Sequence, residues 1–183
     1  PELRENAGEL EAARRRELPE LVELADLRGD LHTHTHWSQD GKSTLEQMVA
    51  AAAARGYEYY AITDHSHYLR DGKLHAQLAE IEQLRPRFPE LTILTGVEAN
   101  IRSSGEVDMA EEDLKLLDWV VASVHQAPHS RPTERVLEAM DNPYVDCIGH
   151  LTGRRIGKRG PRDIDVARVI EKAVATGCAL EIN

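Results

Sequence analysis

The sequence predicts an α/β protein built from parallel β/α units. Short runs rich in β-branched residues alternate with helical stretches along most of the chain, and no repeat or low-complexity linker interrupts the series. Strands that alternate with helices pair in parallel, so these units form either an open sheet or a barrel. At 183 residues the chain is long enough for one domain with a sizeable core and too short for two large ones.

The first 28 residues differ from the rest and are expected to form a tether. Residues 6–18 are charged and helix-prone, and Pro19 interrupts them. We interpret the run Arg14-Arg15-Arg16 as a solvated helix face rather than a phosphate site. The start lacks an initiator Met and a signal-peptide pattern, so we expect the chain to be a piece of a longer protein.

Six strands and five helices are expected after this segment. The predicted strands cover residues 29–35, 59–63, 92–98, 119–124, 145–149 and 179–182. The predicted helices cover residues 45–55, 74–85, 111–117, 133–140 and 166–176. Ser43 and Glu46 form a candidate capping box for the first of these helices, and Gly56 provides its stop. Gly177 ends the last helix in the same way.

Composition excludes some classes of protein. With 22 basic and 32 acidic residues the net charge is −10, which argues against a general nucleic-acid surface unless bound divalent cations change the local field. No apolar stretch approaches the roughly 20 residues that a membrane-spanning helix needs. Cys147 and Cys178 lie in apolar runs and are interpreted as small buried hydrophobes of a reducing compartment. We therefore expect a cytoplasmic protein without a membrane partner.

Each of the first five expected strands ends in residue types that bind metal ions. They are His32, His34 and the nearby Asp40 at the first strand, His65 at the second, Glu98 at the third, His125 at the fourth and His150 at the fifth. In β/α barrels this end of the strands carries the active site. Alternate side chains of a strand share a face, so His32 and His34 can point together at one ion.

A lone histidine at a strand end is more often a hydrogen-bonded structural residue than a ligand. Five consecutive strand ends are hard to explain in that way, because burying so many titratable groups together is costly without a compensating charge. Mixed histidine and carboxylate ligands suit zinc, manganese or iron, and bridged ions about 3.5–4 Å apart suit phosphate ester hydrolysis. Such a site activates a water, and no Ser or Cys nucleophile motif is visible.

A Gly-rich stretch with five basic residues, 152–162, follows His150. It is interpreted either as a phosphate cradle or as a solvated loop, and the sequence does not decide between them. Arg154 is the basic residue nearest to His150 and the best candidate for phosphate binding.

Together these motifs resemble the polymerase and histidinol phosphatase (PHP) domain family. HTH at 32–34, TDHS at 63–66, GVE at 96–98, SVH at 123–125 and GH-LTGR at 149–154 follow the order of that family over about residues 29–183. The lead-in PELRENAGELEAA and the stretches LVELADLRGDLHTH, DWVVASVH and NPYVD are similar to the C-terminal half of bacterial family X DNA polymerases. There the PHP domain follows the polymerase core.

The resemblance implies a distorted (β/α)7 TIM-like barrel with three metal ions, manganese or zinc, with iron as an alternative. By motif position the implied ligands are His32, His34, Asp40, His65, Glu98, His125 and His150, with Glu98 as a bridge. Glu98, His65 and Arg154 are the implied catalytic residues. The implied activity is a manganese-dependent 3′–5′ exonuclease that trims DNA 3′ ends during repair. Residues 1–28 would be the tether from the polymerase core, and residues 29–183 the phosphoesterase domain.

The sequence departs from the family pattern at three points. The loop from His34 to Asp40 carries Gln39 and is one residue longer than in most family X members, and Leu151 replaces the usual proline. The last family motif, Asp-x-His, would lie beyond Asn183, so we expect this chain to lack the final strand and two ligands. Weak metal retention and poor activity are expected of it alone.

Two other functions remain open on the sequence. The first is a small-molecule phosphatase of the histidinol phosphate type, which prefers monoesters and needs no DNA-binding neighbour. The second is a non-catalytic module that braces a polymerase core. The lead-in that resembles family X polymerases favours the nuclease.

Overall fold

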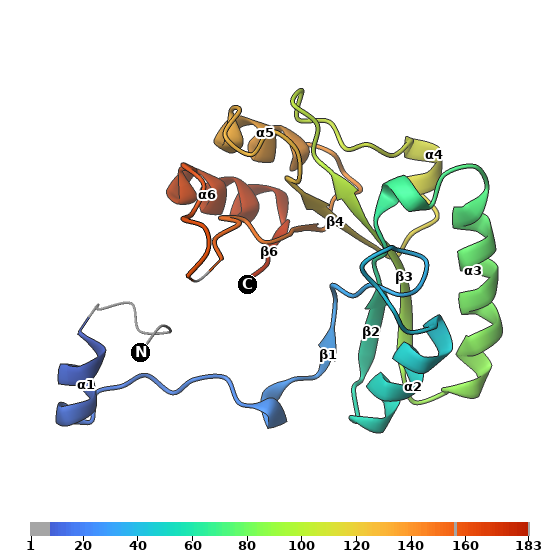
Figure 1. Ribbon diagram of the computed structural model, residues 1–183, viewed down its shortest axis with the longest axis horizontal. Coiled ribbons are helices and arrows are strands. Elements are labelled where there is room, and N and C mark those ends of the chain that lie inside the picture. The colour runs from blue at the N-terminus through green and yellow to red at the C-terminus, as the bar shows by residue number, and fades with distance from the viewer. Residues whose placement is uncertain (1–7, 156, 183) are drawn as a thin grey trace.

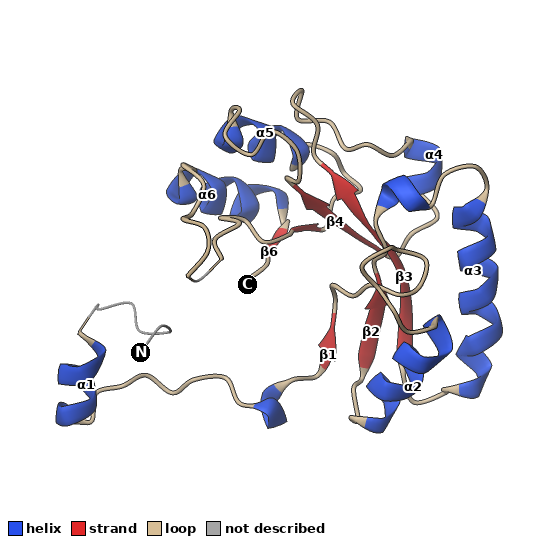
Figure 2. Ribbon diagram, in the orientation of Figure 1, coloured by secondary structure: helices blue, strands red, loops and turns tan. Residues whose placement is uncertain are grey.

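Six parallel strands form one curled sheet in the order of the sequence, β1-β2-β3-β4-β5-β6. The structure is a computed structural model that describes residues 8–155 and 157–182. Its strands are β1 (Gly29–Asp30), β2 (Tyr59–Ile62), β3 (Thr92–Asn100), β4 (Trp119–Ser123), β5 (Cys147–Ile148) and β6 (Ala179–Leu180). Figure 2 shows them fanning out into an open half-barrel. The predicted α/β class with parallel β/α units is confirmed.

A helix follows each of the first five strands. These helices are α2 (Leu45–Ala54), α3 (Lys73–Leu84), α4 (Glu111–Leu114), α5 (Pro132–Ala139) and α6 (Val166–Thr176). Short 3-10 turns cover Leu24–Asp26, Ser66–Tyr68 and Arg85–Arg87. In Figure 1, α2 and α3 lie beside β2 and β3, while α5 and α6 lie together beyond β4. The helices therefore cover the sheet and leave the carboxyl ends of its strands for the site.

The core consists of two apolar clusters. One joins α2 and α3 to β2 and β3 through fully buried side chains such as Leu45, Ile62 and Ile81. The larger one joins β3, β4 and β5 to the later helices. Trp37 packs against both clusters, and its indole N–H donates to Glu80 at 2.9 Å. Each fully buried Leu or Ile contributes about 1.5–3 kcal/mol, so these clusters fix the strands whose ends carry the site.

Helix α2 begins one residue later than the predicted capping box implies. Thr44, not Ser43, is its N-cap, and its hydroxyl accepts from the Gln47 N–H while Gln47 bonds back to the Thr44 N–H. The carbonyl of Ser43 accepts the backbone N–H of His36 at 2.9 Å. This bond ties Ser43 to the preceding loop, so the Ser43–Glu46 box was wrong.

Strand β1 is shorter than predicted because a side-chain hydroxyl, rather than a backbone carbonyl, accepts the hydrogen bond from the Thr33 N–H. The Thr63 N–H donates to the Thr33 carbonyl at 3.0 Å, but the Thr33 N–H donates to the Thr63 hydroxyl at 2.7 Å. Residues 31–35 thus still lie beside the chain that continues β2, but they do not form the regular backbone hydrogen bonds of a strand pair. The histidines on this segment remain at the same edge of the sheet as the other strand ends.

The first described residues form an arm that lies apart from the sheet. Helix α1 (Glu9–Arg15) and an extended segment lead to β1, and none of residues 8–28 is buried (Figure 1). Leu21, Val22 and Leu24 are each more than three-quarters exposed. No helix in the described part of the chain is long and apolar enough to cross a membrane. Cys147 and Cys178 are buried and free, and burial raises the pKa of their thiols to about 12 and about 11.

Candidate metal centre

The carboxylate of Glu98 lies at the centre of a cluster of five imidazoles. Glu98 belongs to β3, and its side chain is 1% exposed. Its Oε2 lies 3.3 Å from His32 Nε2, 3.4 Å from His34 Nε2 and 2.9 Å from His65 Nδ1, and its Oε1 lies 3.1 Å from His125 Nε2 and 2.9 Å from His150 Nε2. The fold therefore brings together histidines from four other strand ends around one buried acid.

The parallel sheet explains this convergence. Successive strands end at the same edge, and an isolated parallel bridge places His65 directly beside Glu98. His150 follows β5 with a backbone φ of 24°, a conformation that L residues rarely adopt. The His150 N–H donates to the Glu181 carboxylate at 2.8 Å, and its carbonyl accepts from Gly153 at 2.9 Å. These bonds hold the strained turn and aim the imidazole at Glu98.

Asp40 joins the cluster through His65 rather than through Glu98. Its Oδ2 lies 3.1 Å from His65 Nε2, and its side chain is 54% exposed. Burial alone would raise the pKa of this carboxyl, but His34 and His65 hold it below its ordinary value. Asp40 is thus the most solvent-accessible acid that the sequence assigned to the site.

Three overlapping groups of side chains have the geometry to hold metal ions. They are His32, His34 and Glu98; His34, Asp40 and His65; and His65, Glu98 and His125, with the ligand atoms of each group within 4.8 Å of one another. Mixed nitrogen and carboxylate donors suit zinc, manganese and iron. Among the described residues His34 Nδ1 is buried without a hydrogen-bond partner, and His65 Nδ1 approaches Glu98 outside hydrogen-bond geometry. Orphaned imidazole nitrogens beside a buried carboxylate fit divalent ions.

The cluster is strongly coupled electrostatically. Burial alone would lower the pKa of His32, but the carboxylates of Glu181 and Glu98 raise it from 6.5 to about 10. Burial alone would raise the pKa of Glu98, but His125, His150 and the other imidazoles hold it far below its ordinary range. The carboxylate therefore stays ionised and attracts cations, either protons on the imidazoles or metal ions.

Sequence reasoning missed two residues that support the histidines. Glu181 Oε2 lies 2.9 Å from His32 Nδ1, and Asn100 Oδ1 lies 2.6 Å from His125 Nδ1. The signal was present in both cases. Glu181 stands at the end of the sixth strand, as the assigned residues stand in or after the ends of the first five, and Asn100 stands two residues beyond Glu98 on the same face of β3. Such partners fix the orientation of metal-binding imidazoles.

Asp108 fixes the orientation of Asn100. Its Oδ2 accepts the Asn100 side-chain amide at 2.9 Å, and its Oδ1 accepts the Asn100 backbone N–H at 2.8 Å and the Ser66 hydroxyl at 2.6 Å. Because the amide nitrogen of Asn100 faces Asp108, its oxygen faces His125. Nδ1 of His125 therefore carries the proton, and Nε2 presents a lone pair to the centre.

The basic stretch after β5 contains a half-buried arginine, Arg162, and a group of exposed ones, of which Arg159 also donates to the Gly153 carbonyl at 2.9 Å. Arg162 donates to the carbonyls of Val124 at 2.6 Å and Leu151 at 3.1 Å, so it holds the loop in place. Arg154, Arg155 and Arg159 line a cavity of about 280 Å³ together with His125 and His150, and no acidic residue of the described part of the chain lines it. Arg154 thus lies in the same cavity wall as His125 and His150, and its role in phosphate binding stays a prediction.

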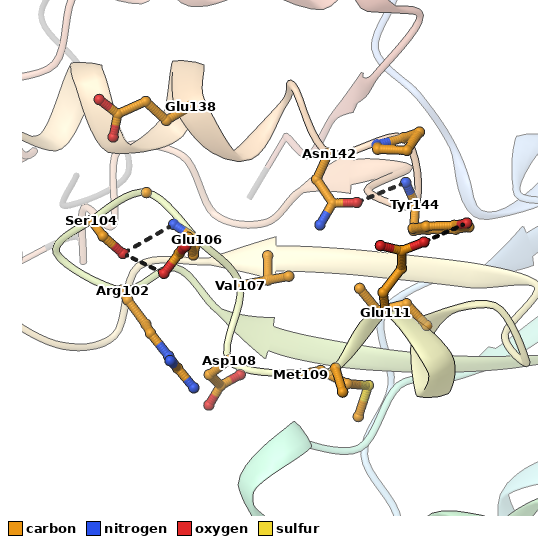
Figure 3. A pocket seen from close by; sticks show the side chains of 14 residues that line it. Arg102, Ser104, Glu106, Val107, Asp108, Met109, Glu111, Glu138, Asn142 and Tyr144 are labelled. Carbon is orange, nitrogen blue, oxygen red and sulfur yellow. Dashed lines mark hydrogen bonds between the residues drawn. The ribbon is translucent and has the colours of Figure 1, made fainter.

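A cavity of about 660 Å³, larger than the one beside Arg154, lies elsewhere. It is bordered by the loop 102–110, α4 and the end of α5, and none of the clustered histidines lines it. Figure 3 shows Ser104 bonded to Glu106 on one side and Tyr144 bonded to Asn142 and Glu111 on the other. These bonds join residues of the cavity wall to one another, whereas the candidate metal ligands lie around Glu98.

Comparisons with known proteins agree with this geometry. The model of the PHP domain family matches residues 30–183. The DNA polymerase/3′-5′ exonuclease PolX of Bacillus subtilis (strain 168) is 40% identical over 192 aligned residues, which cover the whole of this chain and 33% of that protein. A probable phosphatase of Acetivibrio thermocellus is 35% identical over 84% of this chain and 64% of its own length. The chain thus spans a third of the first relative and just under two thirds of the second.

A solved structure shows the same fold at low sequence identity. It is the histidinol phosphate phosphatase of Lactococcus lactis, complexed with zinc, L-histidinol and phosphate. The match has a TM-score of 0.62 and 22% identity, and covers 85% of this chain and 73% of the other. With the family model matching residues 30–183 and the fold agreeing, this chain belongs to the PHP domain family.

Proposed function

We propose that this chain is the 3′–5′ exonuclease domain of a family X DNA polymerase and hydrolyses phosphodiesters at DNA 3′ ends. The observation that carries the proposal is the Glu98 carboxylate with its five imidazoles, four of which form three overlapping ligand groups with Glu98 and Asp40, while His150 lies 2.9 Å from Glu98. The Bacillus relative, named as a polymerase and 3′-5′ exonuclease, aligns with the whole chain, including the arm before β1. On this proposal residues 1–28 connect the domain to a polymerase core.

The proposed ligands are the seven residues that the sequence assigned: His32, His34, Asp40, His65, Glu98, His125 and His150. Oε2 of Glu98 faces His32, His34 and His65, whereas Oε1 faces His125 and His150. A carboxylate whose two oxygens face different sets of imidazoles is suited to bridge ions, so we assign Glu98 as the bridge. Three divalent ions, manganese or zinc with iron as an alternative, are proposed for the complete site.

Bound divalent ions supply Lewis-acid polarisation of phosphoryl oxygens and lower the pKa of a water. The protein supplies the remaining parts of the reaction. His65 lies between Asp40 and Glu98, and its two ring nitrogens contact one carboxylate each, so the imidazole fixes the position of Asp40 relative to Glu98. Arg154 lies beside His150 in a cavity lined by arginines and binds the phosphoryl oxygens of the substrate.

A labelled oligonucleotide tests this function. A single strand with a 5′ label, incubated with the chain and saturating Mn²⁺ to offset its expected weak metal retention, is expected to give products slowly shortened from the 3′ end. A matched reaction with p-nitrophenyl phosphate measures monoester hydrolysis. An intact oligonucleotide beside rapid release of p-nitrophenol would overturn the nuclease assignment.

That second outcome would favour a small-molecule phosphatase of the histidinol phosphate type. The observation in favour of this candidate is the probable phosphatase of Acetivibrio thermocellus, which aligns with 84% of the chain. Histidinol phosphate as substrate, with release of inorganic phosphate as the readout, would then measure this activity directly.

A further inference from the structure

A second basic cavity is lined by residues next to His125 in sequence and in space, and it shares no lining residue with the cavity of the arginine loop. Its volume is about 370 Å³, and its lining includes Arg70, Asn100, Arg102, Asp108, Gln126 and Arg135. Asn100 also accepts a hydrogen bond from His125 at 2.6 Å, so this cavity begins directly beside the metal cluster. His125 itself lines the first cavity, with Arg154, Arg155 and Arg159. His125 therefore lies between two cavities that are both lined by arginines.

A buried arginine holds the walls of the second cavity together. The Arg135 side chain is 1% exposed and donates to the carbonyls of Arg102 at 2.8 Å, Gln126 at 2.9 Å and Ala127 at 3.0 Å, and also to that of Ile101. It thus ties the segment after β3 to the loop after β4. Among the described residues no carboxylate forms an ion pair with it. Its positive charge therefore adds to the potential inside the cavity.

The charge of the cavity contrasts with that of the chain. Three arginines and one aspartate line it, whereas the whole chain carries a net charge of −10. The aspartate, Asp108, is 8% exposed and is already bonded to Asn100 and Ser66. Arg70 Nη2 lies 3.7 Å from Asp108, and the Arg70 side chain is 61% exposed, so Asp108 orients a guanidinium that remains open to solvent. Arg102 is exposed at the same rim.

Two separate basic cavities exceed what a phosphate monoester needs. A monoester places one phosphate at the metal centre and one cationic contact beside it. A polynucleotide carries a phosphate on every nucleotide, and proteins bind its backbone through successive arginine contacts. Guanidinium groups bind phosphate in a bidentate manner, which suits the exposed side chains of Arg70 and Arg102.

We propose that the cavity between Arg70 and Arg102 binds the phosphate adjacent to the scissile one in a single-stranded polynucleotide. The inference rests on the proposed nuclease function and deepens it, because it identifies a subsite that monoesters do not fill. Arg70 and Arg102 make the contacts, and Arg135 keeps the two walls at a fixed separation.

The test uses Arg70→Gln, Arg102→Gln and the double variant, with Arg55→Gln as the matched control. Arg55 is exposed at the end of α2, and helix C-termini lie at the edge of the sheet opposite to the strand ends that carry the site. Binding of a fluorescent, nuclease-resistant phosphorothioate oligonucleotide is followed by anisotropy in Mn²⁺ over a range of salt concentrations. The double variant is expected to bind about 10-fold more weakly, with a salt slope smaller by about 0.7, the value for one phosphate contact on a single strand.

Comparing hydrolysis of the oligonucleotide with hydrolysis of a monoester distinguishes a wrong subsite from a wrong nuclease assignment. The ratio of kcat/KM for the oligonucleotide to kcat/KM for p-nitrophenyl phosphate is expected to fall about 10-fold in the double variant and to stay unchanged in Arg55→Gln. If wild-type protein shortens the oligonucleotide and the ratio does not fall, the subsite is wrong and the nuclease stands. If wild-type protein hydrolyses only the monoester, the nuclease itself is wrong. Arg102→Gln alone leaves the Arg70–Asp108 pair intact, so an effect of this variant excludes a disturbance through Asp108.

Discussion

Oδ1 of Asn100 lies 2.6 Å from Nδ1 of His125, and the amide nitrogen of the same side chain lies 2.9 Å from Asp108. Asn100 is therefore an oriented acceptor that selects one tautomer of a histidine whose other nitrogen faces Glu98. This relationship extends the site beyond its candidate ligands and assigns a function to a residue that the sequence motifs do not contain.

Replacing Asn100 by Leu is expected to weaken metal binding by about 10–100-fold, as loss of such a partner does at other histidine sites. The leucine cannot accept from Nδ1, so His125 can adopt the wrong tautomer. Competition with a zinc-binding dye measures the affinity. Asn100→Asp keeps the acceptor but sets a second carboxylate against Asp108, so it should melt at a lower temperature than Asn100→Leu while holding metal better. Equal affinities for wild-type protein and both variants would contradict this role.

The strand-end pattern predicted the cluster because it depends only on strand order and on the direction of a parallel sheet. The same reasoning could have found Glu181, since it stands at the end of the sixth strand. It could not have found Asp108, which reaches Asn100 and Ser66 from a loop whose path depends on tertiary packing. The sequence also left the basic loop ambiguous, because Arg162 and Arg154 look alike until the carbonyls around Arg162 are placed.

Local signals were less decisive for element boundaries. Ser43 and Thr44 both start a pattern of capping-box type, and only the bond from His36 to the Ser43 carbonyl shows which one caps α2. Strand β1 ends early because the Thr63 hydroxyl, rather than a carbonyl, accepts from Thr33. Both differences arise from single hydrogen bonds made outside regular helix or strand pairing, which periodicity cannot reveal.

Glu98→Gln is expected to abolish metal retention, because it removes the only charge shared by five imidazoles. Elemental analysis of protein purified without chelator measures the metal content. We expect two or three equivalents of metal per chain where the cluster is assembled, and less than about half an equivalent per chain in Glu98→Gln. Glu90→Gln, an exposed change away from the cluster, is the control. In the presence of chelator the variant should also unfold at a lower urea concentration than wild-type protein, because a neutral amide replaces the buried carboxylate that the imidazoles contact. Retention of metal by the variant would contradict the central position of Glu98.

The metal-free chain is expected to lose stability as the pH rises from 6.5 to 10. The pKa of His32 is raised from 6.5 to about 10 in the folded chain, where Glu181 and Glu98 outweigh the effect of burial. A raised pKa stabilises the fold fully below the unfolded value and ceases to do so above the folded value. The lowered pKa of Glu98 makes stability depend on pH only at acid pH, below the range from 6.5 to 10. Urea unfolding with chelator present measures the slope, and His32→Gln should reduce it; an identical slope in that variant would reject the assignment.

His65→Ala separates a catalytic domain from a module that only braces a polymerase. His65 contacts both Asp40 and Glu98. Its loss removes one ligand from two of the three candidate metal groups and leaves the group of His32, His34 and Glu98 intact. Shortening of the labelled oligonucleotide is expected to slow by more than about 100-fold, in line with removal of a group that positions the reacting centre. His75→Ala, an exposed change on α3, controls for the loss of an imidazole. Unchanged shortening together with a lower melting temperature would mean that the cluster stabilises the fold and does not catalyse.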